Sequence, residues 1–332
     1  MTIHVAGPIT SALPHFAAVG LAAILDEVEP GTRFRWTSEV HPRCEVLTAL
    51  SDDQVGQAVI AHAERQTRPD AWLQQSVTGA DGGGTALFAV RFKPPSDTGA
   101  WPGHFRQREV TLDAQLQSWG ALDGRYLAAL GEPAWWRHQA GRSPDEGASR
   151  WEMKTRNRGE EFLAQRMRPL ASAVASRSSE AVVSGLTGET MADETGKNRA
   201  DSRTSTGFTT PRPTDSAIAW CALWGISGFP LLHRSTDFSV AAGAWPIDVT
   251  HPTQAALPVF TQATTWAHFR AVMASRQMEG ALSSLAATNE PGAGAARLQE
   301  WGVAAVAHFP ILKTGSSSAP ERQVLTGRIV PL

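Results

Sequence analysis

Apolar residues recur at helical spacing near the start of the chain. Leu13, Phe16 and Ile24 fall on one face of the stretch that covers residues 11–28. Pro14 falls in the first turn of that stretch, where its missing N–H would have no partner in any case. The pattern therefore predicts a helix over residues 11–28, and the Pro-Gly pair that follows it predicts a stop.

Polar and apolar residues alternate over residues 33–37, which predicts a half-buried strand. Ser51 and Gln54 have the spacing of a capping box, so a second helix is expected from there to Arg65. The same reasoning gives further expected elements: helices over residues 111–130, 158–174 (kinked at Pro169), 216–226 and 264–287, short strands over 85–92 and from 303 onward, and a loop over 246–258.

These elements predict an α+β protein in which helices mix with short antiparallel strands. A boundary near residue 140 would divide it into two subdomains, an N-terminal α+β region (1–140) and a C-terminal α+β region (141–332). The second region contains a long polar loop, 184–216, with few large apolar residues. A structureless connection of that length is either disordered or functional. Its central part, residues 187–213, is expected to stay loosely held until a partner orders it.

The composition limits the class of protein. The 332 residues are 42% hydrophobic, which argues against a disordered chain. The longest apolar run, AIAWCALWGI, is far shorter than the ~20 residues of a membrane span. No signal-peptide pattern opens the chain, so a cytoplasmic location without a membrane partner is expected. The two cysteines, Cys44 and Cys221, lie far apart and support neither a disulfide framework nor a zinc site.

Basic and small polar side chains gather in two stretches in the middle of the chain. Because the net charge is only −2, any nucleic-acid binding must be local. In an extended segment alternate residues project from one side, so the three cations of the first stretch would share that side. They lead into the N-terminus of the expected helix, whose free N–H groups favour anions. The pattern predicts contacts with a nucleic-acid backbone by Lys154, Arg156, Asn157 and Arg158 in the first stretch, and by Lys197, Asn198, Arg199 and Arg203 in the second.

Neighbouring residues bear on this prediction. Asn157 is placed to cap the expected helix, with Glu160 in the position that answers the cap. Trp151 and Phe208 would either stack on bases or belong to the core. The alternative to a phosphate-binding stretch is a solvated surface on which Glu160 and Glu161 pair with the arginines. The sequence leaves both possibilities open.

A nuclease motif also appears, in the letters SPDEGASRWEMK. Asp145, Glu152 and Lys154 match the PD-(D/E)xK pattern, in which two carboxylates hold Mg²⁺ and the lysine supports the attacking water. The carboxylates must converge from adjacent strands, so the short stretch between them would have to form a tight hairpin. A metal-dependent nuclease is therefore the first alternative function.

Other catalytic motifs are missing from the sequence. Residues 193–198 resemble a phosphate-binding loop, but Met191 replaces its first glycine and Asn198 replaces the hydroxyl that binds Mg²⁺. The ten histidines show no spacing typical of a zinc hydrolase, and no nucleophile elbow occurs. No catalytic residue, metal or cofactor is therefore expected. A small-molecule enzyme whose polar residues meet only in the fold stays the second alternative.

Three stretches carry a resemblance when they are taken together: LPHFAAVGLAAILDE with FRWT shortly after it, EMKTRNRGEEFLAQRMRPLA, and DSRTSTGFTTPRPTDSAIAWCALWGISGFPL. They resemble, in this order, segments of proteins encoded beside type I-G (formerly I-U) CRISPR systems. Those proteins have an Ala/Gly/Leu-rich helix before a strand with Arg and Trp, then a polar segment that ends in a Phe-Leu helix. A Gly/Pro-rich loop before an apolar helix with tryptophan follows. The resemblance spans most of residues 10–232.

This resemblance implies a large-subunit-like or accessory subunit of a CRISPR interference ribonucleoprotein. Such a subunit is expected to bind guide RNA or target DNA through the charge of the backbone and to contact other effector subunits. Cleavage would be left to a separate helicase-nuclease. The sequence therefore predicts a non-enzymatic, nucleic-acid-binding protein of antiviral defence.

Overall fold

A computed structural model describes residues 1–78, 84–91, 100–116, 120–134, 144–153, 161–199, 202, 206–234, 238–316 and 319–332. The protein has an α+β fold, as the sequence predicts: helices surround and separate several small antiparallel sheets. In the described part of the chain, no helix combines the length and the apolar character that crossing a bilayer requires.

Local sequence signals account for the first two helices. α1 (Ala12–Asp26) confirms the first expected helix, and nearly all of its residues are buried. α2 (Asp52–Thr67) begins with the expected capping box: the Ser51 hydroxyl accepts a hydrogen bond from the Gln54 N–H at 3.3 Å, and the Gln54 side chain accepts one from the Ser51 N–H at 2.9 Å. The described chain further contains α3 (Ala100–Leu116), α4 (Ala121–Leu130), a π-helical turn (Leu163–Met167) that continues into α5 (Arg168–Ala175), α6 (Ser179–Thr187), α7 (Ser216–Trp224), α8 (Trp266–Met273), α9 (Arg276–Thr288) and α10 (Ala295–Glu300), with short 3-10 turns at Trp72–Gln74, Pro144–Gly147, Gly225–Gly228 and Gly292–Gly294.

The first sheet combines the N-terminal segment with a strand from much later in the chain. It contains β1 (Thr2–Val5), β2 (Arg33–Trp36), β3 (Cys44–Leu47) and β10 (Thr264–Thr265) in the order β1-β3-β2-β10, and all pairs are antiparallel. β3 lies between β1 and β2, so β1, α1 and β2 form a split β-α-β unit. Phe34 and Trp36 of β2 point inward and are buried in the core.

The second sheet is organised around one long strand, β11 (Val303–Ser316). Its first half pairs with β9 (Gln254–Phe260) on one side and β13 (Arg328–Pro331) on the other, and its second half pairs with β12 (Ala319–Val324). β8 (Ala244–Trp245) pairs with the start of β9. The remaining strands form two small hairpins, β4 (Ser76–Thr78) with β5 (Gly84–Ala86) and β6 (Leu231–Leu232) with β7 (Val240–Ala241).

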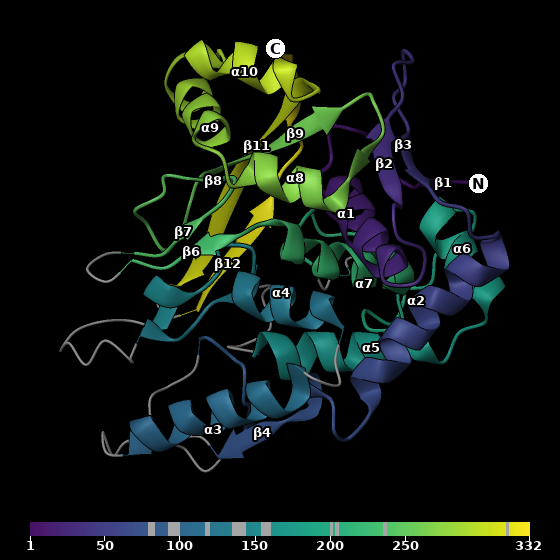
Figure 1. The fold of residues 1–332 in the computed structure, drawn as a ribbon, viewed down its shortest axis with the longest axis vertical. Helices are drawn as coiled ribbons and strands as arrows, with labels where there is room; N and C mark the ends of the chain where they lie inside the picture. The colour runs from purple at the N-terminus through teal and green to yellow at the C-terminus, as the bar shows by residue number, and fades with distance from the viewer. Residues whose placement is uncertain are drawn as a thin grey trace.

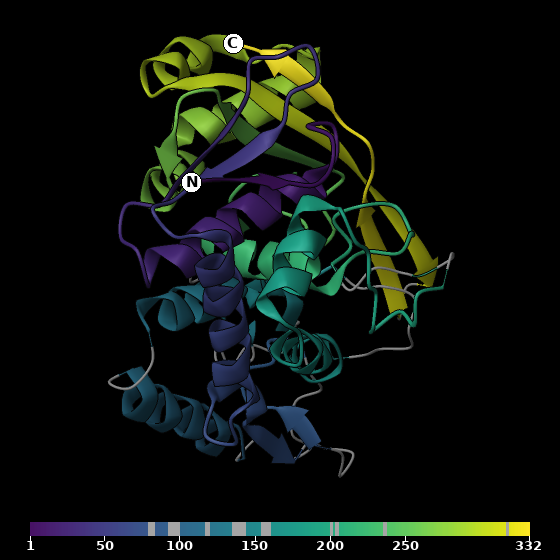
Figure 2. The same cartoon turned by 90° about the vertical axis from the view of Figure 1, so that its right-hand side faces the viewer.

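The elements are arranged along the length of the molecule. The strands β2, β9 and β11 lie toward one end with α8, α9 and α10, and α3 with β4 lies at the other end (Figure 1). α1 and α7 lie between these ends. Seen from the side, the β11–β12 hairpin (yellow) extends from its sheet along one side of the molecule (Figure 2).

The core depends on a close crossing of α1 and α7. A Cβ added at Gly20 would lie 1.8 Å from the backbone oxygen of Cys221, and one added at Gly225 would lie 2.1 Å from the backbone oxygen of Phe16. Glycine at both positions lets the two backbones touch. A single cluster of buried apolar residues extends from β1 to β12, so the regions 1–140 and 141–332 share one core.

Several predicted elements differ at their ends. The expected loop over residues 246–258 is wrong from residue 254 onward, because residues 254–258 belong to β9. Pro258 suggested a break, but β8 pairs only with the first two residues of β9, so no strand on that side needs an N–H from the proline. The helix expected over 264–287 is divided at Ser275, whose hydroxyl accepts a hydrogen bond from the Met278 N–H at 3.1 Å and caps α9.

The buried stripe expected around Pro169 is confirmed. Leu163, Met167, Leu170 and Val174 are all fully buried. Where the sequence predicts a kink at Pro169, the structure has a π-helical turn directly before α5. Pro169 itself lies in the first turn of α5. The strand expected over residues 85–92 is shorter, because β5 ends at Ala86.

Candidate functional site

A cluster of arginine side chains holds the segment Pro144–Met153 by its backbone. The guanidinium of Arg150 donates to the carbonyl oxygens of Asp145 at 2.7 Å and Ala148 at 2.6 Å. Arg322 reaches the same segment from β12 and donates to the carbonyl of Glu152 at 2.7 Å. Each of these arginines is only 2% exposed. We call Arg91, Arg150 and Arg322 the arginine cluster; Arg91 donates to the carbonyl of Glu152 at 2.9 Å.

The carboxylates near the arginine cluster are shared unevenly. Arg91 binds two of them, with 2.5 Å from its Nε to Asp145 Oδ1 and 3.2 Å from its Nη1 to Glu152 Oε2, and Asp145 and Glu146 act on Arg150. Arg322 donates only to carbonyl oxygens and forms no ion pair with a described carboxylate. Burial lowers the pKa of Arg322 well below its usual value, Arg91 and Arg150 lower it further, and Asp145 and Glu152 oppose them. A cation that has no carboxylate of its own favours the binding of an anion.

The same cluster accounts for the unusual state of Glu152. This side chain is 4% exposed, and burial raises its pKa to about 7, although Arg91 acts in the opposite direction. A carboxyl group that is half protonated near neutral pH neutralises its arginine neighbours only in part. The net charge of the cluster therefore becomes more positive as the pH falls.

The nuclease motif is brought together, but around a guanidinium. Asp145 and Glu152 both bind Arg91, which occupies the position between the two carboxylates. Lys154 lies outside the described residues. Within the described ranges, no group of three or more His, Cys, Asp or Glu side chains is arranged to hold a metal ion. A cation that bridged these carboxylates would first have to displace Arg91.

The first basic stretch, with Lys154, Arg156, Asn157 and Arg158, lies outside the described residues, and so does Glu160. Its C-terminal neighbour Glu161 is described. The Glu161 carboxylate accepts hydrogen bonds from the N–H groups of Leu163 at 2.7 Å and Ala164 at 2.8 Å. Glu161 therefore caps the helix that begins at residue 162, the task that the sequence assigned to Asn157. Since backbone N–H groups hold its carboxylate, Glu161 is not the free surface acid that the solvated alternative requires.

The second basic stretch lies on a tight, exposed turn. Lys197, Asn198 and Arg199 are exposed, and the φ angles of Lys197 (55°) and Asn198 (53°) are left-handed. The Asn198 side chain accepts a hydrogen bond from the Asp193 N–H at 2.6 Å, so it serves the turn itself. Lys197 and Arg199 project from this turn, and Arg203 lies outside the described residues.

The long polar loop expected over residues 184–216 differs from the prediction. Residues 184–187 belong to α6. The described part beyond them is not structureless, because Arg177 binds Glu194 at 2.7 Å and Asp215 at 2.7 Å and also donates to the carbonyl of Ala192. Polar contacts replace the apolar ones that the composition lacks, which is why composition alone suggested a loose segment.

Residues that flank the two basic stretches lie together beside the arginine cluster. Met153 directly precedes the first stretch, and Gly207 follows Arg203, the last residue of the second, by four residues. A Cβ added at Gly207 would lie 2.4 Å from the Met153 Cβ, and the Gly207 carbonyl accepts a hydrogen bond from the Val324 N–H at 2.9 Å. The described parts of the segment 188–215 run beside the β11–β12 hairpin (Figure 2). Both stretches therefore adjoin described residues next to Arg322, while Lys197 and Arg199 themselves lie on the turn that Asp193 holds.

The two aromatic residues of this region belong to the core. Trp151 and Phe208 are fully buried. The Phe208 ring stacks on Phe16 with 3.8 Å between centroids, and the Trp151 N–H donates to the carbonyl of Ala242 at 3.0 Å. The possibility that they stack on bases is therefore wrong, and the core alternative holds.

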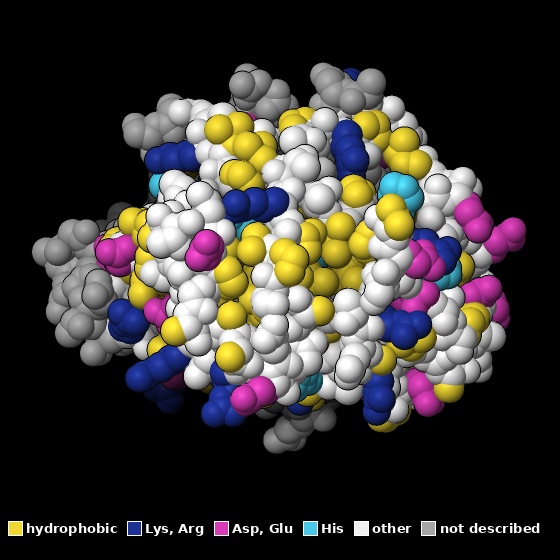
Figure 3. Space-filling model, turned by 90° about the horizontal axis from the view of Figure 1, so that it is seen from above, with side chains coloured by type: hydrophobic (Ala, Val, Ile, Leu, Met, Phe, Trp, Pro, Cys, Tyr) yellow, Lys and Arg dark blue, Asp and Glu magenta, His cyan; other side chains and the backbone are white. Residues whose placement is uncertain are grey.

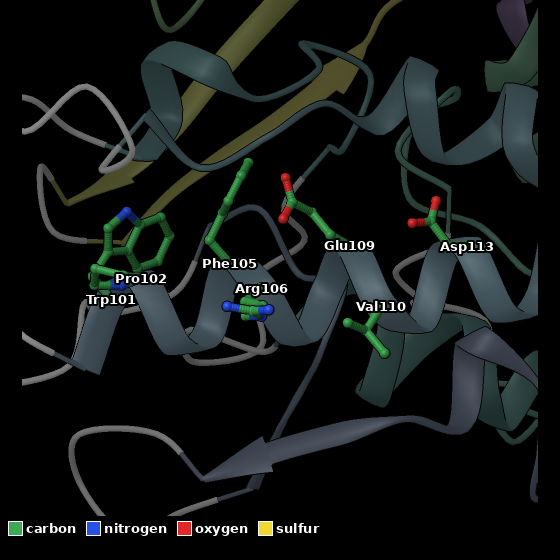
Figure 4. A pocket seen from close by; sticks show the side chains of 7 residues that line it. All are labelled: Trp101, Pro102, Phe105, Arg106, Glu109, Val110 and Asp113. Atoms are coloured by element: carbon green, nitrogen blue, oxygen red, sulfur yellow. The ribbon is translucent and has the colours of Figure 1, made fainter.

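A cavity of about 480 Å³ lies along α3, and its described lining comes from that helix (Figure 4). Trp101, Phe105, Glu109 and Asp113 project to the same side, with Arg106 next to them. One cation against two carboxylates does not favour phosphate. The α3 cavity is therefore a poorer anion site than the arginine cluster.

The end of the molecule near α9, α10 and the C-terminus has a different character. Apolar side chains gather in the middle of this face, with single Lys and Arg side chains around them and several acidic ones toward one side (Figure 3). Scattered charges of both signs do not form a continuous path for a polyanion. The side chains that the structure describes on this face therefore form no continuous basic path.

Comparison with known proteins adds no family to this description. No protein-family model and no curated protein matches the chain. The sequence missed Arg91, Arg150 and Arg322, since they lie far apart in the chain and match no motif. The one local signal was the alternation of the C-terminal strands, which places Arg322 on the same face as the buried Val324.

Proposed function

We propose that this protein is a non-enzymatic, nucleic-acid-binding subunit of a CRISPR interference ribonucleoprotein. In this proposal the two basic stretches contact the phosphate backbone of guide RNA or target DNA. Lys154, Arg156 and Arg158 act together with Lys197, Arg199 and Arg203, and Asn157 and Asn198 support their segments. Other effector subunits are the protein partners, and the resemblance over residues 10–232 supplies this context.

One observation carries the proposal: Met153, which directly precedes the first basic stretch, packs against Gly207, which follows Arg203 of the second stretch by four residues, beside the arginine cluster. Chain connectivity limits the distance from this point to at most ~3.6 Å per residue, over one residue for Lys154 and four for Arg203. Both stretches thus adjoin a region in which Arg322 has no carboxylate of its own. Phosphate groups bind such regions without regard to base sequence.

The binding proposal is tested by a salt titration of single-stranded RNA and DNA. Each phosphate contact displaces condensed counterions, so Lys154→Ala/Arg156→Ala/Arg158→Ala should flatten the slope of log affinity against log salt by roughly two to three units. The matched control removes three exposed arginines that have local acidic partners elsewhere: Arg43→Ala/Arg68→Ala/Arg297→Ala. The proposal fails if the two triple variants bind with the same slope.

The nuclease alternative has its own test. If Asp145 and Glu152 held Mg²⁺, the pure protein would cut nucleic acid, and Asp145→Ala would abolish cutting while binding stayed largely intact. We expect no Mg²⁺-dependent cutting, because Arg91 already binds both carboxylates. Cutting that disappears in Asp145→Ala would replace the binding proposal with a nuclease.

A further inference from the structure

A further pair of basic side chains lies beside the arginine cluster and reaches solvent. Lys313 on β11 is directly opposite Arg322 on β12, so both side chains project from the same face of the hairpin. The Arg322 guanidinium donates to the carbonyl of Thr250 at 3.4 Å, which places the next residue, His251, close to the same group. Lys313 is exposed and His251 is half-buried. The three side chains therefore form a site that is closed on the side of Arg322 and open on the side of Lys313.

Lys313 and the Nδ1 of His251 have no partner within the described residues. Lys313 forms no ion pair with a described carboxylate, and Arg322 binds carbonyl oxygens only. His251 Nδ1 is buried and has no hydrogen-bond partner in the described ranges. Asp145, the acid that acts on His251, is ion-paired with Arg91. A buried nitrogen without a partner, beside a lysine without an ion pair, is what a bound anion would satisfy.

We propose that Lys313, His251 and Arg322 bind one phosphate group. Lys313 contacts the phosphate from the open side as a mobile point charge. Arg322, which is held by three carbonyl groups, supplies positive charge from the closed side of the site. His251 donates from Nδ1 when it is protonated. Resting on the proposed function above, we assign this phosphate to the backbone of the bound nucleic acid; a free phosphate or sulfate ion shares the chemistry and is distinguished by experiment.

The site gives binding a dependence on pH. In the free protein, burial and the cations Arg322, Lys313 and Arg91 lower the pKa of His251 to about 4, while Asp145 opposes them. A bound phosphate offsets the repulsion from the cations, so the pKa of His251 rises in the complex. A group with a higher pKa in the complex takes up a proton on binding, so affinity increases as the pH falls. Protonation of Glu152 also increases the affinity as the pH falls. The contribution of His251 to this pH dependence is therefore isolated by substituting His251.

The experiment uses the full chain and two probes, a single-stranded RNA and inorganic sulfate, which stays fully charged at working pH. Lys313→Ala should weaken RNA binding about fivefold to tenfold and reduce the salt slope by about one unit. His251→Gln should bind RNA like the wild type at alkaline pH and lose part of the gain at acidic pH. Arg297→Ala removes one exposed charge on α10 and should change affinity less than about twofold.

Sulfate identifies the source of the phosphate. If the site also binds a free anion, sulfate should raise the melting temperatures of the wild type and of Arg297→Ala. The rise should be smaller for Lys313→Ala. An RNA effect without a sulfate effect assigns the site to the nucleic-acid backbone alone. If Lys313→Ala and His251→Gln match Arg297→Ala with both probes, the site is overturned, whether or not the basic stretch at 154–158 binds RNA. If sulfate binds through Lys313 and RNA does not bind at all, the site stands and the proposed function fails.

Discussion

Arg177 is half-buried and Arg322 is buried, and the two differ in whether carboxylates bind the guanidinium. Arg177 binds the carboxylates of Glu194 and Asp215 at 2.7 Å each. Burial acts to lower the pKa of Arg177, but the hydrogen bonds to these two acids raise it above its usual value. Arg322 has only carbonyl partners, and burial, Arg91 and Arg150 lower its pKa although Asp145 and Glu152 act to raise it. Arg177 is a neutralised clamp, whereas Arg322 has no carboxylate of its own.

This difference separates a structural role from a binding role. Removing one partner of a buried ion pair destabilises the fold, because the other charge is left buried without compensation. A buried cation without an acid is tolerated when an anion compensates it in the working complex. We therefore expect substitutions at the Arg177 clamp to affect folding and substitutions at the arginine cluster to affect binding.

The largest effect on stability is expected at the clamp. Arg177→Met leaves Asp215, which is 4% exposed, without its guanidinium, and should lower the free energy of unfolding by about 3 kcal/mol. Asp215 keeps hydrogen bonds from the N–H groups of Ala192 and Ala217, which limits the loss. Chemical denaturation measures it, with Arg297→Met as the exposed control, expected within ~0.5 kcal/mol. Trypsin should also cut residues 188–199 faster. A loss equal to that of the control would contradict the clamp.

The next effect concerns pH and has opposite signs in the two regions. The pKa of Glu152 is raised to about 7 from 4.5, so its carboxyl favours the folded state at low pH and costs stability as the pH rises from 4.5 through 7. Glu152→Gln should remove roughly 2 kcal/mol of this decline between about pH 5 and pH 8. Burial acts to raise the pKa of Glu194, but hydrogen bonds from Arg177 and Ser216 lower it overall. Glu194→Gln should instead weaken the loss of stability that occurs in acid.

Urea denaturation across this pH range measures both slopes. Glu39→Gln serves as the control, since it changes an exposed acid that pairs with the exposed Arg43. If the stability of Glu152→Gln declines with pH as steeply as that of the wild type, Glu152 is an ordinary ionised partner of Arg91.

The smallest effect on stability is expected at Arg322. Arg322→Met loses hydrogen bonds to three carbonyl groups but also removes a cation that repels Arg91 and Arg150. The net loss should be about 1 kcal/mol, the value of a typical hydrogen bond. Nucleic-acid affinity should fall clearly in the same variant, measured by titration beside Arg177→Met. A stability loss larger than that of Arg177→Met would reverse the assignment of roles.

Local signals predicted elements better than they predicted contacts. The capping box at Ser51 and the apolar helix over 216–226 depend on residues a few positions apart, and both are confirmed. The strand that contains Pro258 was missed, because it is stabilised by pairing with β11, more than 40 residues later. The cap formed by Glu161 was not predicted, since asparagine has the better intrinsic capping propensity; the cap predicted at Asn157 lies outside the described residues.

The candidate site shows the same division more sharply. The two basic stretches were visible as runs of cations, but Trp151 and Phe208 beside them proved to be core residues. Asn198 was expected to bind the backbone of a nucleic acid, but its side chain accepts a hydrogen bond within its own turn. Arg91 and Arg150 carried no signal, and Arg322 carried only the alternation of its strand. Single arginines are common in sequences, and only their convergence on one segment makes them notable.

The sequence by itself determined the fold class, the positions of α1, α2 and α7, and the location of two cationic runs, because helical periodicity, capping and charge are properties of neighbouring residues. Only the tertiary structure decided that Arg322 reaches the carbonyl of Glu152, 170 residues away, and that Lys313 and His251 lie beside it. The physical reason is that a guanidinium binds whatever acceptor the packing of distant strands presents. Which charges are left uncompensated is therefore a property of the folded chain.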